Sequence, residues 1–205
     1  VELVLERGVD RHLLLFGRRC QVEVVEVEQP PQLGHRVGVV VDPEVDSHVV
    51  EPALHELVKT TGESASFYVR EGNIRSCVAR VEGPQSVRHN VRIGERLPLD
   101  KGAPGRVILA FSGAKGEPYE SIRERGFHIS MGERESEVSS VAAPVFSVNW
   151  RLLGSMCISG PTSRLSKATL EKHARSVVRA ANELSYALAG GKSASTPKAV
   201  SKWHP

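Results

Sequence analysis

The sequence contains little of what disulfide-bonded, metal-binding or membrane-spanning proteins require. It has three cysteines, Cys20, Cys77 and Cys157, which are far apart and form no Cys-x-x-Cys or Cys/His pattern. Neither a disulfide framework nor a zinc site is therefore expected. The longest apolar runs, such as residues 13–16 and 107–111, fall far short of the roughly 20 residues that cross a bilayer. With no secretory pattern either, we expect a cytoplasmic globular protein that needs no metal or cofactor and contacts no membrane.

Motifs for catalysis are also lacking. No nucleophile stands beside a base, no carboxylate pair lies in a defined motif, and residues 102–105 lack the GK[ST] ending that would hold a nucleotide. Cys157 lies in a predicted central strand (SMCIS), where a buried structural thiol is the usual outcome. We therefore expect no enzyme and no catalytic residues.

The first 49 residues lack an excess of positive charge. They contain no Lys, five Arg and nine Asp or Glu, a net charge of −4, whereas residues 50–205 have a net charge of +7. A DNA-reading domain normally has an excess of Lys and Arg, which displace counterions from phosphates. The acidic segment also holds two Val-rich runs, residues 21–28 and 37–41, which could pair as a hairpin.

From Pro52 onward the patterns agree with one another. A short helix starting at Pro52 and ending before Gly62 is predicted, followed by a hairpin of two strands around a turn at residues 71–73. The expected strands are residues 64–70, 74–81, 87–93, 127–131, 139–146 and 151–159; the expected short helices are 106–111 and 120–125, the first after a loop at 98–105. This mixed order predicts an α/β (α+β) fold, an antiparallel sheet flanked by helices.

The longest predicted helix comes last. Ser166 can cap its start and Gly190-Gly191 ends it. One continuous apolar stripe runs along it, formed by Leu170, Ala174, Val177, Val178, Ala181, Leu184 and Leu188. Residues 192–205 are polar and unpatterned, which is typical of a mobile tail.

Three motifs, in order along the chain, resemble landmarks of the effector-binding domain of IclR-family transcription regulators, a GAF-like fold. The first is L-P-L-D-K-G-A-P-G-R-V-I-L-A at 97–110. The second is R-G-F-H-I-S-M-G-E at 125–133 with V-S-S-V-A-A-P-V-F at 138–146, and the third is C-I-S-G-P at 157–161. The resemblance covers roughly residues 53–188 and implies an effector-binding domain over 50–191.

The resemblance also implies a pocket for a small organic acid or aromatic metabolite, between the sheet and the loop before Gly105. Matched by position, the ligand-binding residues would be Leu97, Ala103, Pro104, Gly105, Ser130, Glu133, Val138, Ser140, Cys157 and Ser159. The alternating side chains of a strand would place Cys157 and Ser159 on the pocket face and Ile158 on the other. Asp100, Arg106 and Cys157 depart from the family's common His, Lys and Ser, so no relative's ligand can be carried over.

Members of the family also bind DNA through an N-terminal winged helix-turn-helix, and they form dimers or tetramers. Residues 1–49 show no such motif, which suggests a truncated or mis-framed start. The leading hypothesis is an effector-sensing transcription regulator. Two alternatives stay open: an enzyme on a GAF-like scaffold that uses Cys157 or Cys77 as nucleophile, and a plain dimerisation module whose pocket is filled by side chains.

Overall fold

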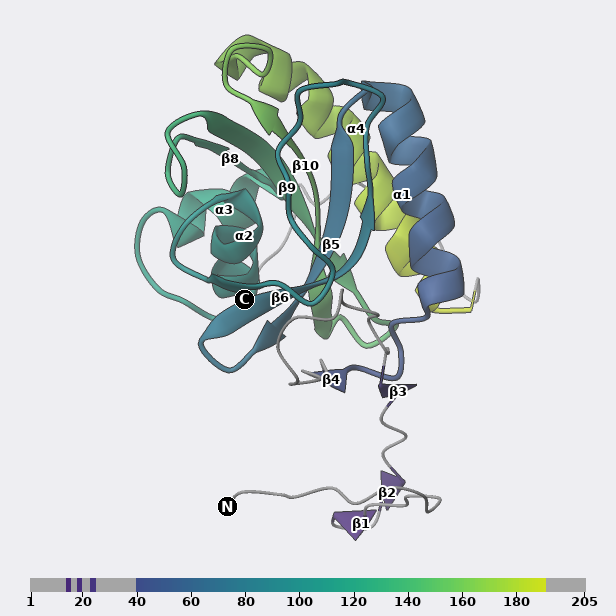
Figure 1. The fold of residues 1–205 in the computed structure, drawn as a ribbon. Helices are drawn as coiled ribbons and strands as arrows, with labels where there is room; N and C mark the ends of the chain where they lie inside the picture. Colours follow the sequence, from purple (N-terminus) through teal and green to yellow (C-terminus); the bar gives the residue numbers. More distant parts are fainter. Residues whose placement is uncertain (1–13, 16–17, 20–22, 25–39, 191–205) are drawn as a thin grey trace, which may run out of the picture.

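A computed structural model describes residues 14–15, 18–19, 23–24 and 40–190 (Figure 1). Most of the acidic segment and the expected mobile tail at 192–205 lie outside the described residues. Within the segment, β1 (Leu14–Leu15) pairs with β2 (Arg18–Arg19), and β3 (Glu23–Val24) pairs with β4 (Val40–Val41), both antiparallel. The second pair joins the two Val-rich runs, as the hairpin prediction requires.

The centre of the molecule is a six-stranded sheet in the order β7-β6-β5-β10-β9-β8, and every neighbouring pair is antiparallel. Its strands are β5 (Ser64–Glu71), β6 (Ile74–Val81), β7 (Arg96–Pro98), β8 (His128–Met131), β9 (Val138–Phe146) and β10 (Leu152–Pro161). The expected class, an antiparallel sheet flanked by helices, is confirmed.

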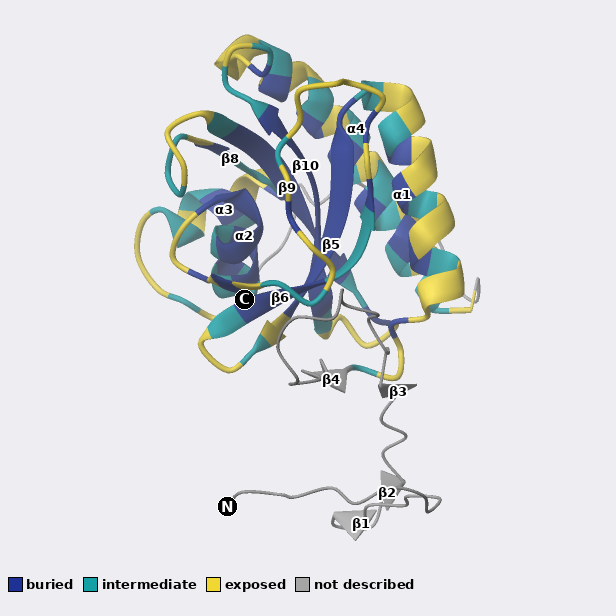
Figure 2. Ribbon diagram, in the orientation of Figure 1, coloured by how far each residue is buried: buried dark blue, intermediate teal, exposed yellow. Residues whose placement is uncertain are grey.

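Helices cover both faces of this sheet. One face carries α1 (Ser47–Thr61) and the long α4 (Lys167–Leu188), and the other carries α2 (Ala103–Phe111) and α3 (Tyr119–Arg125) (Figure 1). The central strands are buried on both sides (Figure 2). No helix in the described part of the chain is long and apolar enough to span a membrane.

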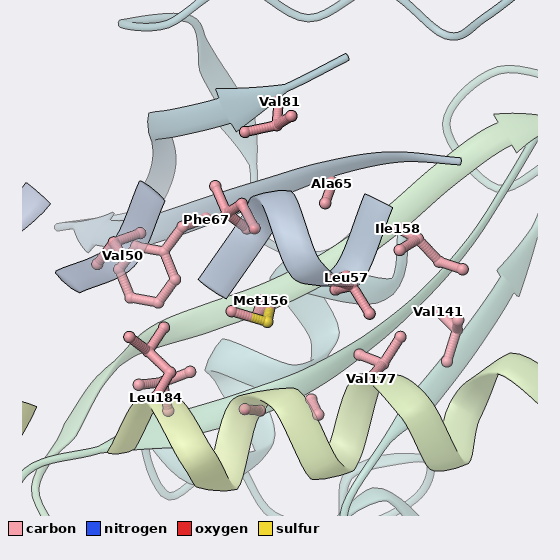
Figure 3. Close-up of a cluster of buried hydrophobic side chains, with 14 of the residues drawn as sticks. Val50, Leu57, Ala65, Phe67, Val81, Val141, Met156, Ile158, Val177 and Leu184 are labelled. Carbon is pink, nitrogen blue, oxygen red and sulfur yellow. The ribbon is translucent and has the colours of Figure 1, made fainter. Parts of the chain in front are cut away.

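Alternation along β10 divides the core between the two faces. Met156 and Ile158 pack with Phe67 and Val177 under α1 and α4 (Figure 3). Cys157, the residue between them, belongs to the separate cluster under α2. The predicted stripe of α4 is confirmed, since five of its members are buried and the other two pack against them. Ser166 caps the helix by accepting a hydrogen bond from the backbone N–H of Thr169.

Helix α1 begins earlier than the sequence indicated. The predicted start at Pro52 is wrong, because the helix starts at Ser47 and contains Pro52 in its interior. Asp46 supplies the cap by accepting a hydrogen bond from the backbone N–H of His48. Val45 and Val50 are buried in the core, so packing in this region continues back past residue 50.

The predicted strand at residues 87–93 is also wrong. These residues form a loop, and the strand beside β6 is the later β7. Only Val91 of the apolar positions is buried, while Val87 is 69% exposed and Ile93 37% exposed. An alternating pattern predicts a strand only where a neighbouring strand is free to pair, and β7 already pairs with Ile74 to Ser76 of β6.

Candidate ligand pocket

A small hollow lies between the sheet and the start of α2, on the face opposite α1 and α4. Its walls come from all six strands of the central sheet, the 82–95 loop, the start of α2 and the β8–β9 loop. Tyr68, Arg75, His89, Leu97, Gly102, Pro104, Ser130, Arg134, Glu135, Val138, Ser140, Cys157 and Ser159 line it. The cavity volume is about 30 Å³, measured as the space that the centre of a water molecule can occupy. One water needs at least about 10–15 Å³ by that measure, so the hollow suits only a few atoms or needs to widen.

Seven of the ten residues expected to bind a ligand line this hollow. They are Leu97, Pro104, Ser130, Val138, Ser140, Cys157 and Ser159. Ser159 lies directly opposite Ser140 in the β9–β10 pair, which places both hydroxyls on one wall. Cys157 and Ser159 face the hollow together and Ile158 faces the other core, as alternation predicted. Whether these residues bind a ligand stays a prediction.

Ala103, Gly105 and Glu133 do not line the hollow. Ala103 is fully buried in the apolar cluster under α2. Glu133 accepts hydrogen bonds from the backbone N–H of Gly102 at 3.2 Å and from Nε of Arg106 at 2.7 Å. The anion at the start of α2 is therefore the protein's own Glu133, and this contact attaches the β8–β9 loop to the helix.

Gly105 lies where α2 passes close to the chain before it. A Cβ there would meet the carbonyl oxygen of Leu99 at 2.3 Å and a guanidinium nitrogen of Arg75 at 2.6 Å. We expect Gly105→Ala to lower the free energy of unfolding by roughly 1–3 kcal/mol, because a backbone atom cannot yield as a side chain can. Urea denaturation measures this, with Ser112→Ala on the exposed end of α2 as control. Equal stability of the two variants would contradict the close approach.

Six lining residues were not expected from the sequence: Tyr68, Arg75, His89, Gly102, Arg134 and Glu135. A signal existed for one of them. Arg75 and Cys77 are two residues apart in one strand and so share a face, and an arginine beside an apolar residue on the same strand face is uncommon. His89 and Arg134 come from irregular loops, whose course no periodic pattern predicts.

Arg75 is the unusual member of the lining. It is only 2% exposed, and its Nη1 donates to the backbone carbonyls of Pro98 and Lys101. Its guanidinium lies 5.4 Å from the ring centroid of Tyr68, and its Nε is buried with no hydrogen-bond partner among the described residues. No described carboxylate forms an ion pair with it. Since a buried charge is costly unless it is paired, Arg75 suits an anion that enters the hollow.

His89 connects the loop at 82–95 to two other walls. Its Nδ1 lies 3.1 Å from Oγ of Ser159, and Nη2 of Arg134 contacts its Nε2. A guanidinium can only donate, so Nε2 is the acceptor and Nδ1 carries the proton that it donates to Ser159. Burial, followed by the positive charges of Arg134, Arg80 and Arg75, lowers the pKa of His89 from 6.5 to about 4. His89 is therefore neutral at physiological pH.

Both described cysteines are unsuited to nucleophilic chemistry. Burial raises the pKa of the Cys77 and Cys157 thiols to about 12. We expect neither to react with iodoacetamide at pH 8 in the folded protein, because the thiolate is the reactive form, and both to react in guanidinium. Peptide mass spectrometry distinguishes these states. Rapid labelling of folded Cys157 would instead favour the cysteine enzyme.

A second, wider groove lies between α1 and α4. It has a volume of about 380 Å³ and is lined by apolar residues such as Val49 and Ala180 together with Glu56, Arg179 and Glu183. These charged side chains reach solvent, and no buried charge lies among the lining residues. The groove therefore has less of the chemistry that a small polar ligand needs.

Comparison with known proteins agrees with this architecture. Residues 44–118 and 117–186 match the family model described as the bacterial transcriptional regulator IclR C-terminal domain. BhcR, an HTH-type transcriptional regulator of Paracoccus denitrificans, is 27% identical over 168 residues, which are 70% of this chain and 60% of BhcR. KipR of Bacillus subtilis is 26% identical, over 67% of this chain and 65% of KipR. The chain thus spans less than two thirds of these relatives.

Solved structures show the same relationship. The C-terminal domain of a protein described as a transcriptional regulator from Vibrio cholerae is 27% identical, with a TM-score of 0.61, over 68% of this chain and 96% of that one. The IclR protein of Thermotoga maritima shares the fold with a TM-score of 0.62 at 23% identity. Because the family model matches more than half of this chain, the chain belongs to the family of IclR C-terminal domains.

Proposed function

We propose that this chain is the sensing part of a transcription regulator, and that the pocket around Arg75 binds a small organic acid. The observation that carries the proposal is the buried guanidinium of Arg75, whose Nε has no partner among the described residues. A carboxylate at Nε would satisfy this donor and neutralise the charge in one contact. An aromatic acid would require the hollow to widen first.

The regulatory step rests on the relatives. BhcR and KipR are named as HTH-type transcriptional regulators, so we propose that a DNA-binding module works with this domain and that the protein acts as a homodimer or tetramer. A ligand that binds one arrangement of such an assembly better than another shifts the population between them, and thereby changes how the module engages its operator.

Regulation is favoured over the two alternatives. The relatives are regulators and not enzymes, and the raised pKa of both described thiols disfavours a cysteine nucleophile. In a plain dimerisation module, an apolar side chain in place of Arg75 would fill the same space without burying a charge.

A thermal-shift screen tests the proposal. A ligand that binds only the folded state raises the apparent stability by RT ln(1 + [L]/Kd). The panel is a set of small aliphatic and aromatic carboxylic acids at constant ionic strength, and at least one should raise the melting temperature of the wild type.

Two variants locate the site of any hit. Ser159→Leu places a larger side chain on the pocket wall and should remove the shift, whereas Ser163→Leu, on an exposed turn, should keep it. Ser140→Val is a milder change on the same wall, for use if Ser159→Leu fails to fold. No hit in the panel, or a hit that persists in the folded wall variants, would refute the proposed site.

A further inference from the structure

Positive charge exceeds negative charge around the pocket. Three guanidiniums, those of Arg75, Arg80 and Arg134, lie close enough to lower the pKa of His89 through their charge. One carboxylate, that of Glu135, lies in the lining, where its Oε1 pairs with Nη2 of Arg134 at 2.7 Å. The other nearby carboxylate, Glu133, is paired with Arg106. His89 is neutral, so this group holds a net charge of two positive units.

Arg75 and Arg80 of β6 form no ion pair with a carboxylate of the described residues. Arg75 donates only to backbone carbonyls, and Arg80 donates to Oγ of Ser66 and to the carbonyl of His89. Both Nε atoms are buried without a partner among the described residues. Carbonyls and hydroxyls accept hydrogen bonds but carry no charge that could compensate a guanidinium.

The Arg134 end of the pocket can also accept an anion. Its partner Glu135 is 49% exposed in its side chain, so that carboxylate can move into solvent, where it is hydrated, at little cost. Arg134 itself is 18% exposed and contacts His89, which remains in place through Ser159. Two cationic groups therefore line one hollow from different walls, Arg75 from β6 and Arg134 from the β8–β9 loop.

From this charge arrangement we infer that the ligand is a small dianion, with one acidic group bound by Arg75 and the second by Arg134 together with Ser159. With Glu135 moved into solvent, the three guanidiniums hold three positive units, so a monoanion would leave two of them uncompensated and a dianion leaves one. The inference rests on the proposed function and narrows it, because it specifies the charge of the ligand bound at the same pocket. A short dicarboxylate and inorganic phosphate both supply this chemistry.

Matched ligand pairs test the inference. Oxalate, malonate and succinate are each compared by calorimetry with the half-amide (oxamate, malonamate, succinamate), which keeps the shape and removes one charge; inorganic phosphate is titrated in parallel. All titrations use the same ionic strength and pH 7.5. The tightest binder should be a dianion, and amidation of a dicarboxylate that binds should weaken binding about tenfold or more, because a charge-assisted hydrogen bond is lost.

Variants assign the second charge to its site. In Arg134→Gln the preference for a dicarboxylate over its half-amide should fall to about threefold or less. Arg88→Gln, which removes a partly exposed arginine outside the pocket lining, should keep the full preference. If phosphate binds and no carboxylic acid does, the dianion is inorganic, which contradicts the organic acid of the proposed function and keeps the dianion; Arg134→Gln should then weaken phosphate binding by a similar factor.

The failures are distinguishable. Half-amides that bind as tightly as the dicarboxylates would overturn the inference and leave the proposed function intact. The same holds if monocarboxylates from the thermal-shift panel bind and no dianion does, or if Arg134→Gln keeps the full preference. If no carboxylate or phosphate binds at all, both the inference and the proposed function fail.

Discussion

Replacing Arg75 with methionine should weaken the binding of the acid that binds the wild type most tightly by about 100-fold or more. The variant loses a charge and at least one charge-assisted hydrogen bond to the ligand. Methionine keeps much of the apolar stem that packs against Tyr68. Titration calorimetry measures the change. Arg70→Met on the neighbouring strand, where the side chain is exposed, should bind like the wild type.

Two controls distinguish the loss of the charge from a loss of packing. Near-ultraviolet circular dichroism shows whether Arg75→Met keeps its packing, because the carbonyls of Pro98 and Lys101 lose their donor. Arg75→Lys keeps the charge but has one flexible ammonium in place of the planar fork, so its affinity should lie between wild type and Arg75→Met. Unchanged affinity in a folded Arg75→Met variant would exclude Arg75 as the anion site.

Acid should destabilise the protein through His89. The folded-state pKa is about 4 and the ordinary value is 6.5, so between these values the unfolded chain binds the proton and the folded chain does not. The stability is therefore fully present above about pH 6.5 and is lost as the pH falls toward 4. With only 8% of the side chain exposed, the loss should be on the order of 3 kcal/mol.

A matched variant isolates this contribution. His89→Gln keeps hydrogen-bonding groups toward Ser159 and Arg134 but does not titrate. Urea denaturation at several pH values should give a curve for the variant that is flatter between pH 6.5 and 4. The arginine partners of Asp42 and Glu133 lower the pKa values of these carboxyls despite burial. The stability that these two groups contribute is therefore lost at lower pH, and to the same extent in wild type and variant. Parallel curves for wild type and variant would show that His89 is not held neutral by its surroundings.

The sequence predicted what depends on periodic pattern. Alternation predicted that Cys157 and Ser159 share the pocket face, and the apolar stripe of α4 predicted which residues reach the core. The family motifs predicted seven lining residues, because six of them belong to strands and Pro104 belongs to the first turn of α2, and the positions of these elements follow from the fold. These features can be predicted from the spacing of residues along each strand or helix, once a single sheet is assumed.

The charged part of the pocket could not be predicted in the same way. Arg75 is buried because β7 and α2 close over it, and this is a property of strand order rather than of local spacing. His89 lies in the segment that was expected to be a strand, and its contact with Ser159 joins residues 70 positions apart. Glu133 belongs to one of the family motifs and was expected to bind a ligand. Only the structure shows that it accepts a hydrogen bond from the start of α2 instead.

A crystal structure of the protein with the tightest-binding acid is the most direct test of the anion site. We expect density for the ligand between the sheet and the start of α2, with an acidic oxygen within 3.2 Å of Nε of Arg75, as a hydrogen bond requires. Ligand density in the groove between α1 and α4, or a ligand in the pocket whose acidic group points away from Arg75, would contradict it.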